Sequence, residues 1–120
     1  MTLDRLMFVL KERDLTFADL DAYCALHSKG PDAALDAAAL AVARKYADAA
    51  LDFSVADAAA NTLFAYGAGK GLTPDLMMSV FLAFDAGEFY PDNVRDPSPE
   101  ARFTRPQIAA ILAKYAAGAR

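Results

Sequence analysis

The chain is poor in the residues that build covalent and metal-dependent sites. It has one cysteine, one histidine and no tryptophan among 120 residues. One cysteine cannot form an internal disulfide, which excludes a secreted disulfide scaffold and makes a reducing cytoplasm the expected compartment. One histidine and one cysteine cannot supply the four nitrogen or sulfur ligands of a usual zinc site. We therefore expect no metal and no cofactor.

Long apolar runs and targeting signals are also missing. The longest nearly unbroken apolar run, residues 76–84, holds nine residues and includes Ser79. A membrane helix needs about 20 apolar residues, so this run is far too short. The first residues, Met1 to Arg5, have neither the apolar stretch nor the basic start of a signal peptide. These absences predict a protein that has no membrane partner.

Branched aliphatic residues other than leucine are scarce, whereas alanine is abundant. The chain has two Ile and five Val against 28 Ala. This composition favours helices, because Ala loses no side-chain entropy in a helix. Hydrophobic residues make up 56% of the chain and charged residues 23%, which is typical of a folded protein rather than a disordered one. The length fits a single helical domain over residues 1–120.

Basic residues are outnumbered by acidic ones, and the imbalance is uneven along the chain. The net charge is −4 overall, with −7 over residues 1–94 and +3 over residues 95–120. An acidic body repels a phosphate backbone, so binding to nucleic acid is not expected. Thirteen of the sixteen acidic residues are Asp. Many of them stand where helices should begin, which indicates capping chemistry.

Helix-start signals and helical spacing together predict an all-α fold. Thr16 and Thr104 each precede an acidic or amide residue by three positions, which is the spacing of a capping box. Ser54 with Asp57 is a weaker version, and Thr73 precedes a proline suited to a first helical turn. Apolar residues recur at helical spacing between these signals. We therefore predict a compact bundle of about six helices, with a long ordered loop before the last helix.

The helix expected over residues 75–86 is apolar nearly all round. Such a pattern is typical of a helix at the centre of a bundle, which is the interpretation that we favour. The alternative is an exposed, methionine-rich interface. In that case the chain would be a homo-oligomeric structural or regulatory protein, such as a homodimer.

The segment from Gly87 to Phe103 is longer than most connections between helices. Its aromatic and aliphatic residues argue against disorder. It also contains polar and aromatic residues of the kinds that often contribute binding energy. The predicted partner-binding residues are Tyr90, Asp92, Asn93, Arg95 and Asp96. The alternative is a loop that closes one end of the bundle without a partner.

Catalytic motifs in the sequence are weak. Cys24 and His27 lie three residues apart on one helix face and could form a thiolate–imidazole pair. They continue an apolar stripe, however, so we expect Cys24 to be a small buried hydrophobe and His27 to interact with the helix end. Acidic residues within 85–96 could bind calcium but lack the EF-hand spacing. The glycines of residues 67–73 lack the P-loop spacing. We therefore expect a protein that is not an enzyme.

The function that these observations favour is a non-enzymatic, acidic, helical protein-interaction module. An acidic body suits a basic partner. One specific version is an inhibitor or immunity protein that neutralises a basic toxin or nuclease. The alternatives are the homo-oligomeric protein described above and a helical bundle that binds a small ligand between its helices.

Overall fold

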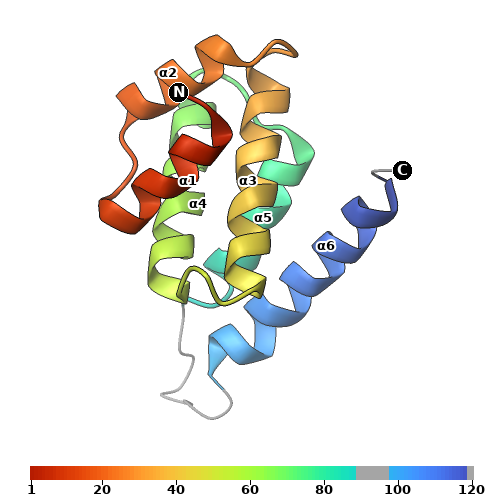
Figure 1. Cartoon of the computed structure of the whole chain (residues 1–120). Coiled ribbons are helices and arrows are strands. Elements are labelled where there is room, and N and C mark those ends of the chain that lie inside the picture. The colour runs from red at the N-terminus through yellow and green to blue at the C-terminus, as the bar shows by residue number, and fades with distance from the viewer. Residues whose placement is uncertain (89–97, 119–120) are drawn as a thin grey trace.

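The computed structural model describes residues 1–88 and 98–118, which form six α-helices, one π-helical turn and no strand (Figure 1). In chain order they are α1 (Leu3–Glu12), α2 (Phe17–Leu26), α3 (Pro31–Ala47), α4 (Phe53–Gly69), α5 (Asp75–Asp85), the π-helical turn η2 (Glu100–Thr104) and α6 (Arg105–Gly118). The prediction of an all-α bundle of about six helices is confirmed. None of these described helices combines the length and the apolar character needed to cross a bilayer.

Helices α3, α4 and α5 pack against one another and form the centre of the bundle. Helices α1 and α2 both pack on α3, and α2 also contacts α4. Helix α6 follows η2 and packs on α3 and α5. Figure 1 shows α6 leaning away from the bundle toward the C-terminus. The outer sides of α4 and α5 are thus left on the surface of the molecule.

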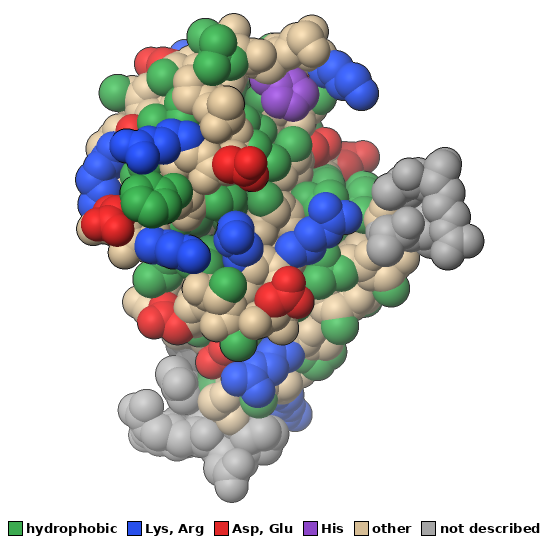
Figure 2. Space-filling view, in the orientation of Figure 1, with side chains coloured by type: hydrophobic (Ala, Val, Ile, Leu, Met, Phe, Trp, Pro, Cys, Tyr) green, Lys and Arg blue, Asp and Glu red, His purple; other side chains and the backbone are tan. Residues whose placement is uncertain are grey.

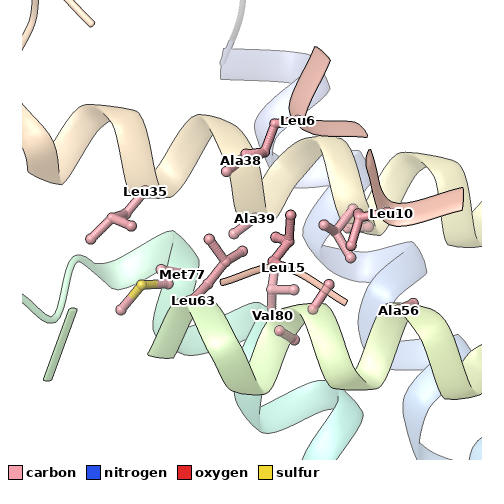
Figure 3. Packing of buried hydrophobic residues seen from close by; sticks show 14 of the residues in the cluster. Leu6, Leu10, Leu15, Leu35, Ala38, Ala39, Ala56, Leu63, Met77 and Val80 are labelled. Carbon is pink, nitrogen blue, oxygen red and sulfur yellow. The ribbon is translucent and has the colours of Figure 1, made fainter. Parts of the chain in front are cut away.

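The core combines alanines from α3 and α4 with larger apolar side chains. Ala38, Ala39 and Ala56 are almost completely buried, and such small side chains let neighbouring helix backbones approach closely. The larger side chains around them include Leu6, Leu10, Leu15, Leu35, Leu63, Met77 and Val80 (Figure 3). The abundance of alanine therefore serves close helix packing as well as helix propensity.

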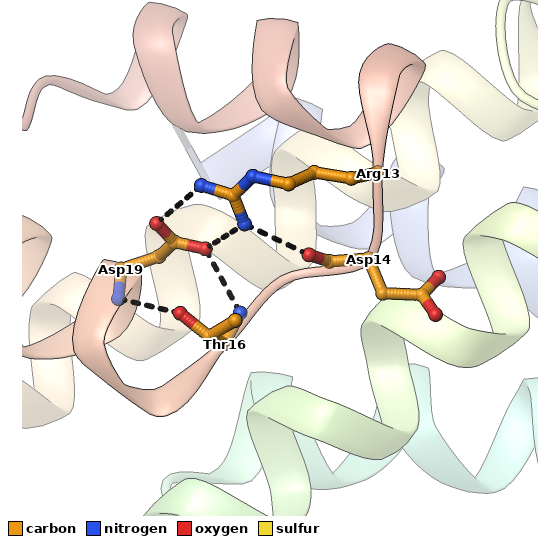
Figure 4. A network of polar contacts seen from close by, with 4 residues as sticks. All are labelled: Arg13, Asp14, Thr16 and Asp19. Carbon is orange, nitrogen blue, oxygen red and sulfur yellow. Dashed lines mark hydrogen bonds and ion pairs between the residues drawn. The ribbon is translucent and has the colours of Figure 1, made fainter.

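The capping box predicted at the start of α2 is confirmed. The Thr16 hydroxyl accepts a hydrogen bond from the Asp19 backbone N–H at 3.1 Å, and the Asp19 carboxylate accepts one from the Thr16 N–H at 2.9 Å. The Arg13 guanidinium donates two further bonds to Asp19, at 2.7 and 2.9 Å (Figure 4). Asp19 is only 7% exposed. Hydrogen bonding to Arg13, supported by Thr16, holds the pKa of Asp19 well below its usual range.

Two other predicted helix starts are wrong in detail. Helix α4 is capped by Asp52 rather than Ser54, since the Asp52 side chain accepts from the Val55 N–H at 2.9 Å. Helix α5 has Pro74 as its N-cap residue and no side-chain cap, so Thr73 does not fill that role. Asp and Ser are comparable caps, and local spacing alone did not distinguish between them.

Thr104 does not begin the last helix as its spacing predicted. The chain is already helical from Glu100, and the buried Thr104 hydroxyl donates to the Ala83 carbonyl of α5 at 2.7 Å. Gly87 permits this approach, because a Cβ at position 87 would overlap with Oγ1 of Thr104. Thr104 is therefore a tertiary contact between η2 and α5 rather than a helix cap.

Helix α5 is buried on one side only. Its buried residues are Leu76, Met77, Val80, Ala83 and Phe84. On the outer side, Leu82 is 53% exposed and Phe81 is partly exposed. The expected position at the centre of the bundle holds, since α5 packs against α3, α4 and α6. These neighbours do not enclose its outer side completely.

Candidate functional site

The loop residues predicted to bind a partner lie outside the described residues. They are Tyr90, Asp92, Asn93, Arg95 and Asp96. Two of the acidic residues weighed as calcium ligands, Asp85 and Glu88, are described. Over residues 1–88 and 98–118, no group of three or more His, Cys, Asp or Glu side chains is arranged to hold a metal ion.

Within the described residues, no hydrogen bond links the Cys24 thiol to Nδ1 of His27. Cys24 is partly buried, and burial raises the pKa of its thiol, which disfavours the thiolate that a nucleophile needs. His27 follows the last residue of α2, and its ring lies 6.0 Å from that of Tyr23. Its Nδ1 is buried and has no hydrogen-bond partner in the described part of the chain. The geometry gives no support to thiolate–imidazole chemistry.

The outer sides of α4 and α5 bring apolar and acidic side chains together. Along α5, Met78, Leu82 and Asp85 follow a helical spacing of four and three residues, which places them on one face. Beside them, Phe81 stacks on Phe64 of α4, with ring centroids 4.1 Å apart and planes inclined by 14°. We call this surface the α4–α5 face, and its members are Asp57, Asn61, Phe64, Met78, Phe81, Leu82, Asp85 and Glu88.

The apolar part of the α4–α5 face is only partly covered. Phe64 and Met78 are half-buried and contact the core. Phe81 rests on the ring of Phe64, and Leu82 is more exposed than either phenylalanine. Burial of apolar surface contributes about 25 cal/mol per Å². A partner that covers Phe81 and Leu82 would therefore gain binding energy from this part of the face.

The acidic part of the α4–α5 face holds three carboxyl groups, those of Asp57, Asp85 and Glu88. Asn61 of α4 reaches the segment that follows α5, since its Nδ2 donates to the Asp57 backbone carbonyl at 2.9 Å and to Oε2 of Glu88 at 3.3 Å. Burial, together with Glu88 and then Asp85, raises the pKa of Asp57 to about 7. Oδ1 of Asp57 is buried and unpartnered within the described residues. Mutual repulsion among these carboxylates favours binding of a cationic group of another molecule at this part of the face.

The charge of the α4–α5 face is not balanced by bases on the same helices. Helices α4 and α5 contain no Lys or Arg. The nearest base in sequence, Lys70, lies over the Tyr66 ring and 3.8 Å from Asp21 of α2. By contrast, Figure 2 shows Lys and Arg side chains spread among acidic ones over α1 and α3, on the face turned to the viewer. Charges are therefore mixed over α1 and α3, whereas the described side chains of α4 and α5 include acidic residues and no base.

A cavity of about 740 Å³ lies between the end of α3, the α3–α4 turn and the start of α6. The Tyr46 hydroxyl donates to Oε2 of Glu100 at 2.6 Å, and Nη2 of Arg105 lies 3.7 Å from the same oxygen. Burial and the Glu100 carboxylate raise the pKa of Tyr46 to about 12, so its hydroxyl keeps its proton and donates at neutral pH. The cavity thus has a defined polar end.

Comparison of the chain with known proteins found no match among protein-family models, curated proteins or solved structures. A functional proposal therefore rests on the chemistry of the two surfaces described above.

The sequence raised an exposed interface on residues 75–86 only as the less favoured alternative, and it gave no sign of the cavity. It placed Asp57 in a weak capping box and favoured a central position for residues 75–86. The signal that could have found the α4–α5 face is the absence of Lys and Arg from two consecutive helices, combined with an apolar pattern wider than one buried stripe. The cavity had no local signal, because Tyr46 and Glu100 are 54 residues apart.

Proposed function

We propose that the protein is a non-enzymatic interaction module whose α4–α5 face binds a basic amphipathic helix of another protein. The observation that carries this proposal is the exposed Leu82 and the stacked Phe64–Phe81 pair beside three carboxyl groups, on two helices without a base. An amphipathic helix docks through apolar side chains that recur at helical spacing. Lys and Arg beside those side chains would meet the carboxylates.

The spacing of the α4–α5 face suits contact with a short helix. Met78 and Asp85 are seven residues apart on α5, which corresponds to about 10 Å along the helix axis. Apolar side chains of the partner would cover Phe81 and Leu82. Basic side chains one turn further along the partner would then reach the acidic end of the face. In its most specific form, the module inhibits a basic toxin or nuclease, since such a partner supplies the required bases.

Charge argues against a second copy of this chain as the occupant. In a two-fold dimer the same face of both copies meets. Two α4–α5 faces would bring acidic residues from both copies and a Lys or Arg from neither helix pair. A basic partner therefore fits the face better than the homodimer that the sequence left open. Sedimentation at micromolar concentration would give a monomeric mass on this account.

Two synthetic peptides test the proposal directly. Each has about 18 residues, or roughly 27 Å of helix, with Leu at helical spacing. One carries Lys beside the Leu stripe, and the other carries Glu at the same positions. Fluorescence anisotropy measures binding, and chemical-shift changes locate it. We expect the Lys peptide to bind α4 and α5 and to bind more weakly as salt rises. Equal binding of the two peptides would refute the proposal.

A pair of matched variants locates the contact. Leu82 on α5 is 53% exposed and Leu26 on α2 is 65% exposed, so neither side chain is needed for the core. We expect Leu82→Ser to weaken binding of the Lys peptide by about tenfold, the loss of one apolar anchor. Leu26→Ser should leave the affinity unchanged. If both variants bind like the wild type, the α4–α5 face is not the binding surface.

A further inference from the structure

The cavity beside α6 has the size of a small-molecule site. Its volume of about 740 Å³ lies within the range of roughly 300–1,000 Å³ that is usual for such sites. Part of its wall is apolar and comes from the end of α3, the α3–α4 turn, the start of α4 and α6. These residues are Ala47, Ala49, Leu51, Phe53, Ile108 and Ala109. The alanines leave room that larger side chains would fill.

The π-helical turn η2 brings two charged side chains to this cavity. The Arg105 backbone N–H donates to the Glu100 carbonyl, five residues earlier. In an α-helix, side chains five residues apart would point about 140° apart, whereas here the two side-chain charges are 3.7 Å apart. Pro106 contributes to the wider turn, because it has no N–H to donate and its ring crowds the carbonyl four residues earlier. Turns of this kind often occur at functional sites.

The polar end of the cavity is held in place from the protein side. Tyr46 is only 8% exposed, and its hydroxyl donates to Oε2 of Glu100. Arg105 approaches the same oxygen. Both contacts thus fix the orientation of the Glu100 carboxylate through Oε2. Within residues 1–88 and 98–118, both contacts are to Oε2, so Oε1 can accept a hydrogen bond from a ligand.

The charge inside the cavity favours a cation. The Glu100 side chain is 26% exposed and that of Arg105 is 66% exposed, so water screens the guanidinium more than the carboxylate. Asp52 adds a second carboxylate to the wall. The rings of Tyr46 and Phe53, whose centroids are 6.5 Å apart, offer aromatic surface that attracts cations.

We propose that this cavity binds a small organic amine with an apolar body. Its ammonium group donates to the carboxylates of Glu100 and Asp52, and its body packs on Leu51, Phe53 and Ile108. The site uses none of the residues of the α4–α5 face. The amine site can therefore be tested independently of the protein partner proposed above.

Three probes with the same phenyl body test this proposal at neutral pH: phenethylamine, phenethyl alcohol and 3-phenylpropionate. NMR titration of the full chain measures affinity and location. We expect phenethylamine to bind with a Kd of about 1 mM or below, with shifts at residues 46–53 and 100–109. The alcohol and the carboxylate should bind at least about tenfold more weakly. Absent binding of the amine, or equal binding of either other probe, would overturn the proposal.

Three variants separate binding from folding. Glu100→Gln keeps an acceptor for Tyr46 but removes the charge, and we expect it to weaken amine binding by about tenfold. Ala109→Leu fills the cavity and should abolish binding. Ala110→Leu is the matched control, since Ala110 is exposed on α6 and lies outside the cavity.

Thermal unfolding shows which of these variants are folded. If Glu100→Gln fails to fold, the two leucine variants still decide the question. Equal amine binding by Ala109→Leu and Ala110→Leu would overturn the proposal.

Discussion

Two acidic regions of this protein stand in opposite electrostatic surroundings. At the corner between α1 and α2, Asp19 accepts hydrogen bonds from Arg13 and Thr16, and its pKa is held well below the usual range. At the acidic end of the α4–α5 face, Asp57 is partly buried beside Glu88, and its pKa is raised to about 7. Ionisation of the first carboxyl stabilises the folded state, whereas ionisation of the second destabilises it.

This difference separates acidic side chains whose ionisation stabilises the folded state from acidic side chains whose ionisation destabilises it. Hydrogen bonds to a charged group contribute about 1.5–3 kcal/mol to stability. A desolvated carboxyl beside other carboxyls opposes folding instead. Such unfavourable groups persist in proteins mainly where they serve function. The contrast therefore supports a binding role for the α4–α5 face and a structural role for the corner.

The largest expected change in stability comes from Asp19, at the corner between α1 and α2. Asp19→Ala removes both bonds to Arg13 and half of the capping box, so we expect the free energy of unfolding to fall by about 2–3 kcal/mol at neutral pH. Chemical denaturation measures the change. Asp14→Ala, an exposed acid in the same turn, is the control and should change stability by less than about 0.5 kcal/mol. Equal losses in the two variants would remove the distinction between paired and unpaired acids.

The same corner should control stability in acid. The folded-state pKa of Asp19 lies below the unfolded value of about 3.9. Its contribution is therefore complete above about pH 4 and is lost as the pH falls through the folded-state pKa. The stability difference between the wild type and Asp19→Ala should narrow steadily below pH 4. A difference that stays constant down to pH 2 would contradict the role assigned to Arg13.

Asp57→Asn should raise the stability of the protein, whereas Asp19→Ala lowers it. The folded-state pKa of Asp57, about 7, lies above the unfolded value of about 3.9, so wild-type stability falls as the pH rises between these values. Asn cannot ionise. We expect a gain of about 1 kcal/mol at pH 8, discounted for the partial exposure of the site, and almost none at pH 4. A loss of stability in Asp57→Asn at pH 8 would contradict this account.

Added salt should produce the smallest of these changes in stability. Burial is the largest single cause of the penalty at Asp57, and Glu88 and Asp85 add to it. Salt screens the charges but not the burial. The gain from Asp57→Asn at pH 8 should therefore shrink by about 0.3 kcal/mol between low salt and 1 M salt without vanishing. A gain that disappears would show that repulsion, not burial, dominates.

The capping chemistry of the corner could be predicted from the sequence because its partners are neighbours in the chain. Thr16 and Asp19 are three residues apart, and no tertiary contact is needed to bring them together. Thr104 has the same local spacing but bonds to Ala83, because Gly87 opens the space for that contact. Local spacing cannot reveal a choice that depends on packing between helices.

Neither the α4–α5 face nor the cavity could be predicted from local sequence patterns, and the reason is the same for both. Asn61 and Glu88 are 27 residues apart, and they meet only because α4 packs on α5. Exposure of Leu82 likewise depends on which sides of α5 the other helices cover. Composition, periodicity and caps therefore predicted the class of fold, whereas the candidate sites required the arrangement of the helices.

The most direct test of the central claim is one double variant, Asp57→Asn with Glu88→Gln, measured for both stability and binding of the Lys peptide. The account predicts a folded protein that is at least as stable as the wild type at pH 8 and binds the peptide at least about tenfold more weakly. A folded double variant that binds the peptide as tightly as the wild type would contradict the claim that these acids serve a basic partner.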